Sequence, residues 1–110
     1  YDRVKKLDLI INAQPRHNYI IGDKFIEFWG KPRAEMAYRF RDWLDNGIVV
    51  AFGADQPISV RCTPLMQIYL AVTRRIGTGD VLGPDQGISR EEASKHRGTP
   101  DVSAARRVAI

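Results

Sequence analysis

Two short apolar runs stand out in the first half of this chain. The first, Leu9 to Ala13, is continuous rather than alternating and is stopped by Pro15. Such a run is typical of a strand that is buried on both faces, as in parallel sheets. The second run, Ile48 to Phe52, is equally continuous and rich in β-branched residues. We therefore expect two adjacent parallel strands that are connected through a helix.

The connection between these strands should contain that helix. Residues 16–31 are expected to form a long connection, which in a compact domain is often functional; the alternative is a helical or looped lid whose aromatic residues simply pack. Pro32 suits the first turn of a helix that continues to about Leu44. Gly47 stands where a left-handed residue commonly follows the end of a helix.

Two more helix starts follow the second strand. Thr63-Pro64 has the capping and first-turn residues of one helix, and Ser89 to Glu92 forms a capping box for another. The first of these helices is expected to bury an apolar face made of Leu65, Ile68, Tyr69 and Val72. The pattern fails after Ala93, so we divide the chain into a segment 1–93 and an unassigned tail 94–110.

The order of these elements places the chain in the α/β class. Strands that are buried on both faces need neighbouring strands, and two of them do not make an independent parallel sheet. The sequence therefore predicts part of a larger α/β sheet or barrel.

Composition narrows the possible functions. Hydrophobic residues make up 44% and charged residues 27% of the 110 residues, which is typical of a globular protein. No apolar run approaches the ~18 residues that a membrane helix needs. The net charge of +4, from 17 basic and 13 acidic residues, is too mild to indicate a nucleic-acid partner. Cys62, the only cysteine, excludes an internal disulfide and favours a reducing, cytoplasmic location.

Asp55 is the main candidate for chemistry. It comes three residues after the second strand and follows Gly53, which lets the backbone turn sharply. In parallel α/β proteins, functional side chains stand at the carboxyl ends of strands, where a carboxylate can bind a cation or accept a proton. The same Gly-x-Asp-x-Pro pattern equally suits an aspartate that only caps a turn.

Gln14 and His17 follow the first strand in the same way, so all three side chains should stand on one side of the sheet. His17 is a candidate for contacting substrate or donating to a developing oxyanion. A single histidine on a loop is, however, more often solvated or packed.

The run from Gly53 to Ile58 resembles the Gly-Ser-Asp-x-Pro-Val segment of the amidohydrolase superfamily. The closest branch is the large family-three type, which includes the N-substituted formamide deformylases. Ile11 to His17 resembles the family's strand-seven ending, in which Gln-Pro-x-His is frequent, and Ala37 to Gly47 resembles the helix that follows it. Pro64 to Arg74 resembles the helix after strand eight, and Gly83 to Ala93 resembles the next helix start. No single motif identifies the family, but the order of these motifs along the chain is specific to it.

This resemblance implies a distorted (β/α)8 metal-dependent hydrolase barrel, of which the chain would be the C-terminal part, about strands seven and eight with their helices. It implies one or two divalent metals, usually zinc, and hydrolysis of C–N or related bonds in small-molecule substrates. Asp55 matches the aspartate that ligates metal and takes the proton of the attacking water. Gln14 and His17 would line the substrate side of the pocket. Ala54 and Gln56 replace the usual Ser and Trp, which alters the pocket wall.

The chain lacks most of what a metal site needs. A catalytic zinc site takes about three protein ligands, and the histidines that the family supplies from earlier strands have no counterpart here. We therefore expect the isolated chain to bind no metal and to be inactive, although the complete enzyme would be a hydrolase. The alternative is a non-catalytic remnant that acts as a protein-interaction module. In both cases its open strand edges predict self-association or pairing with the rest of a barrel.

Overall fold

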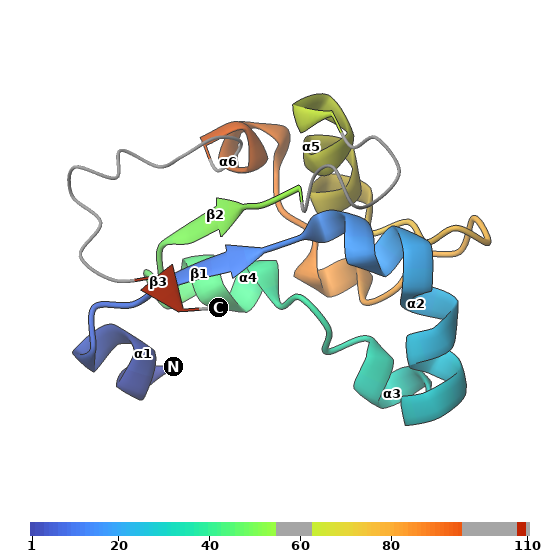
Figure 1. Cartoon of the computed structure of the whole chain (residues 1–110), viewed down its shortest axis with the longest axis horizontal. Coiled ribbons are helices and arrows are strands. Elements are labelled where there is room, and N and C mark those ends of the chain that lie inside the picture. The colour runs from blue at the N-terminus through green and yellow to red at the C-terminus, as the bar shows by residue number, and fades with distance from the viewer. Residues whose placement is uncertain (55–62, 96–107, 110) are drawn as a thin grey trace.

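The computed structural model describes residues 1–54, 63–95 and 108–109, with only the backbone for the last pair. The elements, in chain order, are α1 (Asp2–Lys6), β1 (Ile10–Ala13), α2 (Pro15–Trp29), α3 (Lys31–Ala34), α4 (Phe40–Asp45), β2 (Val50–Phe52), α5 (Pro64–Thr73), a 3-10 turn (Pro84–Gln86), α6 (Arg90–Lys95) and β3 (Val108–Ala109) (Figure 1).

The two apolar runs form the centre of the sheet. β1 and β2 pair in parallel, with Ile11 opposite Val50 and Ala13 opposite Phe52, which confirms the predicted parallel pair. β3 pairs in parallel with the other edge of β1, so that the strand order is β2-β1-β3. This third strand comes from the tail, for which the sequence predicted no element.

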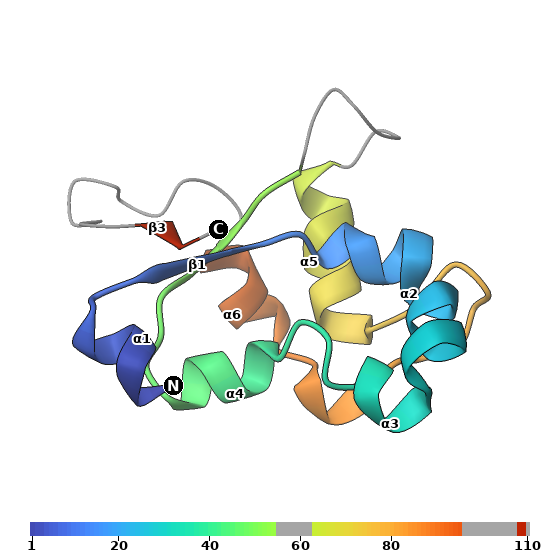
Figure 2. The same ribbon diagram turned by 60° about the horizontal axis from the view of Figure 1, so that its bottom comes forward.

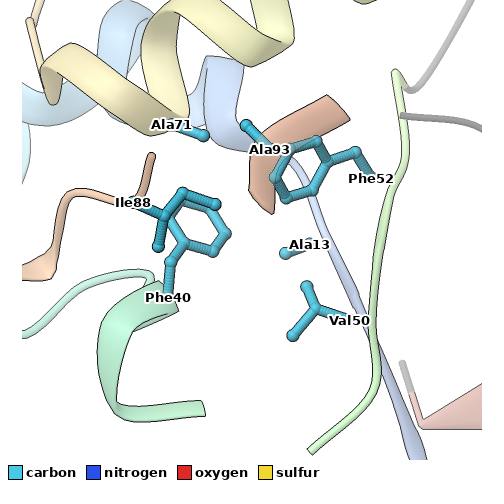
Figure 3. Close-up of a cluster of buried hydrophobic side chains, with 7 residues drawn as sticks. All are labelled: Ala13, Phe40, Val50, Phe52, Ala71, Ile88 and Ala93. Atoms are coloured by element: carbon cyan, nitrogen blue, oxygen red, sulfur yellow. The ribbon is translucent and has the colours of Figure 1, made fainter. Parts of the chain in front are cut away.

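Helices lie on one side of this sheet (Figure 2). Alternate strand residues point toward them and form a core with α4, α5 and α6 (Figure 3). Its buried members are Ala13, Phe40, Val50, Phe52, Ala71, Ile88 and Ala93. On the opposite face Ile10 is buried, but Asn12 is exposed and Val49 is 48% exposed. Within the described residues, that face of the sheet is therefore only partly covered.

Of the two interpretations of residues 16–31, the helical one agrees with the structure and the open connection does not, because Pro15 begins the 15-residue helix α2. Gly22 in its middle reads as a helix breaker, but the structure gives it a packing role. A Cβ added to Gly22 would lie 2.5 Å from Cγ2 of Ile76, so only glycine lets the helix approach this buried side chain.

The expectation of one helix from Pro32 to Leu44 is also wrong, because the segment forms two short helices, α3 and α4. Tyr38 lies between them in the left-handed region, with φ of 53°. A non-glycine residue there interrupts a right-handed helix. The left-handed conformation predicted for Gly47 is confirmed, with φ of 68°.

Both predicted helix caps after β2 are confirmed. The Thr63 hydroxyl accepts from the backbone N–H of Met66 at 3.2 Å at the start of α5. Before α6, the Ser89 N–H donates to the Glu92 carboxylate at 2.8 Å, and the Glu92 N–H donates to the Ser89 hydroxyl at 3.1 Å. These reciprocal bonds satisfy backbone donors that a helix start leaves unpaired.

The apolar face expected for α5 is confirmed only in part, because Ile68 and Val72 are partly buried and pack against the core but Leu65 and Tyr69 do not. The buried residues are Gln67, Leu70 and Ala71, whereas Leu65 is 70% exposed and Tyr69 is 49% exposed. Apolar residues surround most of this helix, so its sequence does not single out one inner face. The positions of α2 and α6, which both pack against α5, decide which side is covered.

The side chain of Arg74 links the end of α5 to the α3–α4 connection and to the segment that contains Leu82. Arg74 ends α5 in the left-handed conformation and is only 1% exposed. Its Nε donates to the carbonyl of Leu82 at 3.0 Å, Nη1 to that of Tyr38 at 3.0 Å, and Nη2 to that of Ala37 at 2.7 Å. Burial lowers the pKa of Arg74 to about 10, so the side chain remains cationic at neutral pH. This guanidinium holds the α3–α4 connection, and with it Tyr38, in place.

Candidate functional site

The carboxyl ends of β1 and β2 bring two amide side chains together over Gly53. Gln14 follows β1 directly and caps α2, and Gly53 follows β2. A Cβ added to Gly53 would lie 2.7 Å from Oδ1 of Asn12 and 3.2 Å from Nε2 of Gln14. Glycine at this position therefore makes room for both amides beside the backbone that leads to Asp55.

Arg16 is a residue of this region that the sequence analysis missed. It stands in the first turn of α2, is 2% exposed, and donates from Nη1 to the carbonyl of Ala54 at 3.3 Å. Its Nη2 is buried and has no hydrogen-bond partner in the structure of the described residues. A buried arginine so close to the strand ends ties α2 to the backbone one residue before Asp55. The only sequence signal for this role is its place in the Gln-Pro-Arg-His run.

His17 lies against Tyr38. Nδ1 of His17 is 2.9 Å from the Tyr38 hydroxyl, and the two rings meet edge to face. Burial raises the pKa of Tyr38, so its hydroxyl keeps its proton at neutral pH and can donate to Nδ1. Either group can be the donor in this contact. If the hydroxyl donates, the imidazole proton stands on Nε2 and is available to another group.

The three residues that the sequence proposed for the site differ in what the structure describes of them. Gln14 lies beside Gly53, and its role in contacting substrate stays a prediction. His17 lies in the first turn of α2. Its side-chain hydrogen bond within the described residues is with Tyr38 and not with the Gly53–Ala54 backbone. Asp55 lies outside the described residues, as do Cys62 and His96. The prediction that Asp55, Gln14 and His17 share one mouth of the sheet stays a prediction.

The described residues do not fit a metal ion by themselves. Among them, no three His, Cys, Asp or Glu side chains lie close enough to hold one. His17 has one ring nitrogen engaged by Tyr38. The donor set at the strand ends is made of amides and a guanidinium, which suits hydrogen bonding to a polar ligand better than cation binding.

Comparison with known proteins shows the family to which the chain belongs. The family model described as "Amidohydrolase family" matches residues 1–98. The chain therefore belongs to the amidohydrolase family, of the family-three type, whose members are hydrolases that act on small molecules. The family is generally metal-dependent. No curated protein and no solved structure matches the chain. Among the described residues, no helix is long and apolar enough to cross a membrane.

Replacing Tyr38 by Phe should free the His17 ring at little cost to the fold. The expected loss in unfolding free energy is about 1 kcal/mol, the usual net value of one hydrogen bond. The 15N chemical shifts of the imidazole should move toward a mixture of tautomers, because Nδ1 loses its hydrogen-bond partner. Tyr19→Phe is the matched control, since Tyr19 is on α2, the helix that carries His17, and its side chain is 38% exposed. An unchanged tautomer in Tyr38→Phe would show that the hydroxyl does not orient His17.

Proposed function

We propose that this chain forms strands seven and eight, with their helices, of a metal-dependent amidohydrolase barrel that cleaves C–N bonds. β1 corresponds to the seventh strand and β2 to the eighth. The observation that carries the proposal is the parallel β1–β2 pair, whose helices, in the part of the chain that the structure describes, lie on one side of the sheet. In a (β/α)8 barrel the helices cover the outer face of the strands, and the other face points to the barrel interior. Exposed Asn12 and Val49 on the uncovered face agree with this arrangement.

In that barrel, Asp55 is proposed to be the catalytic carboxylate. It accepts the proton of the attacking water, and it is also one of the metal ligands. The remaining ligands come from elsewhere, because the described residues contain no ligand set. Gln14 and His17 are proposed to contact the substrate, through the Gln14 amide beside Gly53 and through Nε2 of His17. By this proposal the isolated chain is inactive.

A second candidate function is supported by one observation. A surface pocket of about 320 Å³ lies along the exposed side of α5. Its lining residues are Leu65, Ile68, Tyr69, Val72, Thr73 and Arg90. An apolar surface of this kind, with exposed Leu65 and Tyr69, is suited to bind a protein partner. The chain would then be a non-catalytic interaction module.

Zinc binding and hydrolysis by the isolated chain test the first proposal. Calorimetry with zinc should give no affinity tighter than micromolar, because one carboxylate and one histidine fall short of the roughly three ligands that a catalytic zinc needs. N-substituted amides and formamides should remain intact. Submicromolar zinc affinity that is abolished by Asp55→Asn would contradict the proposal that the site needs residues from outside this chain. In the full-length protein, Asp55→Asn should lower turnover strongly, and normal turnover would show that Asp55 is not the catalytic carboxylate. A full-length protein without any turnover would favour the interaction module.

A further inference from the structure

β1 has two edges, and hydrogen bonds identify the residues that face each one. The Ile11 N–H donates to the Val49 carbonyl at 3.0 Å, and the Ala13 carbonyl accepts from the Gly53 N–H at 2.9 Å. Alternate residues of a strand direct their N–H and C=O groups to opposite edges. Ile10 and Asn12 therefore present their backbone groups to the edge away from β2.

β3 occupies that second edge. It pairs with Ile10 opposite Val108 and Ile11 opposite Ala109. The family match ends at residue 98, so β3 belongs to a segment that lies beyond it. A chain segment outside the family pattern thus pairs with the first half of a strand inside it.

We propose that β3 (Val108–Ala109) is an intramolecular strand that occupies the edge of β1 at which the preceding strand of a complete barrel would pair, and that it protects this edge from a second copy of the chain. The part about the barrel rests on the proposed function, whereas the protection does not. An open edge presents a row of unpaired N–H and C=O groups and readily pairs with another chain. Within the described residues, β3 is the element that covers this edge.

The register identifies the tail residue that makes the pairing. In the β1–β2 pair, Ile11 faces β2 and is opposite Val50, but its N–H bonds to the residue before Val50. The same offset applies at the other edge of β1. There Ala109 is the β3 residue whose backbone N–H and C=O face β1, and these two groups meet the backbone of Ile10 and Asn12. Val108 directs its N–H away from β1, so it provides a matched control.

Three variants test the proposal: Ala109→Pro, Val108→Pro and the chain shortened to residues 1–98. Proline at 109 removes the N–H that faces β1, whereas proline at 108 removes one that points outward, where an edge strand tolerates it. Hydrogen exchange should be about tenfold faster at the Asn12 amide in Ala109→Pro and in the shortened chain. Sedimentation should show self-association that is about tenfold tighter in these two forms. Val108→Pro should behave as the unchanged chain.

The outcomes separate this proposal from the proposed function. Unchanged exchange and sedimentation in both Ala109→Pro and the shortened chain would overturn the edge protection. Equal effects of the two prolines would overturn the backbone pairing at Ala109. Neither measurement depends on hydrolysis, so a failure here leaves the role of Asp55 untouched, and normal turnover in Asp55→Asn leaves the role of the tail untouched.

Discussion

Arg74→Met should lower the unfolding free energy by about 3–5 kcal/mol, a large part of the stability of a domain of this size. Methionine fills a similar volume but removes the guanidinium donors from the carbonyls of Ala37, Tyr38 and Leu82, of which Tyr38 keeps a second donor in the Phe40 N–H. It also removes the guanidinium that lies 5.6 Å from the Phe40 ring centroid. Buried carbonyls that lose a charged donor are costly because water does not replace it.

Urea unfolding followed by circular dichroism gives the size of this effect. Arg75→Met is the control, because the Arg75 side chain is exposed and is held on the surface by the hydrogen bond from Nη1 to the Gly79 carbonyl at 2.9 Å. Its expected cost is below about 1 kcal/mol. Arg74→Lys should lose most of the stability as well, since a single ammonium cannot reach all three segments. A loss below 1 kcal/mol for Arg74→Met would mean that these segments hold together without it.

Asp55→Asn should reduce the turnover of the full-length protein by about 10²–10⁴-fold, the usual contribution of a general base. Asparagine has nearly the same shape as aspartate, but its amide cannot accept the proton of the attacking water. The thermal unfolding midpoint should stay close to that of the unchanged protein. Steady-state kinetics on an amide substrate gives the ratio.

Asp23→Asn is the matched control for Asp55→Asn, because Asp23 is exposed on α2 and the change removes the same charge. It should leave turnover within about twofold. Near-normal turnover in Asp55→Asn would leave Asp55 as a residue that only caps the turn after β2. A collapse of the fold in Asp55→Asn would likewise assign it to structure.

Local sequence patterns determined the elements whose causes are local. The β1–β2 pair followed from two continuous apolar runs, and its parallel register is as expected. The caps at Thr63 and Ser89 followed from side-chain bonds that span only three residues. The family assignment followed from the order of short motifs, and the family match over residues 1–98 confirms it.

Helix α2 escaped prediction because its pattern is not cleanly amphipathic. Ile20, Ile21 and Phe28 are all exposed, so apolar residues do not mark one face. Gly22 reads as a breaker in the sequence, yet it is required by contact with Ile76, more than 50 residues later. The inner face of α5 was equally undetermined, because its neighbours and not its own residues select it.

What the sequence by itself determined is the parallel strand pair, the starts of α5 and α6, the left-handed Gly47 and the family. What only the tertiary structure decided is how distant segments meet: Arg16 with the Ala54 carbonyl, His17 with Tyr38, and Arg74 with carbonyls 36 and 37 positions earlier in the chain. The physical reason is that hydropathy records whether a side chain avoids water. It carries no information on which distant backbone group will satisfy a buried charge.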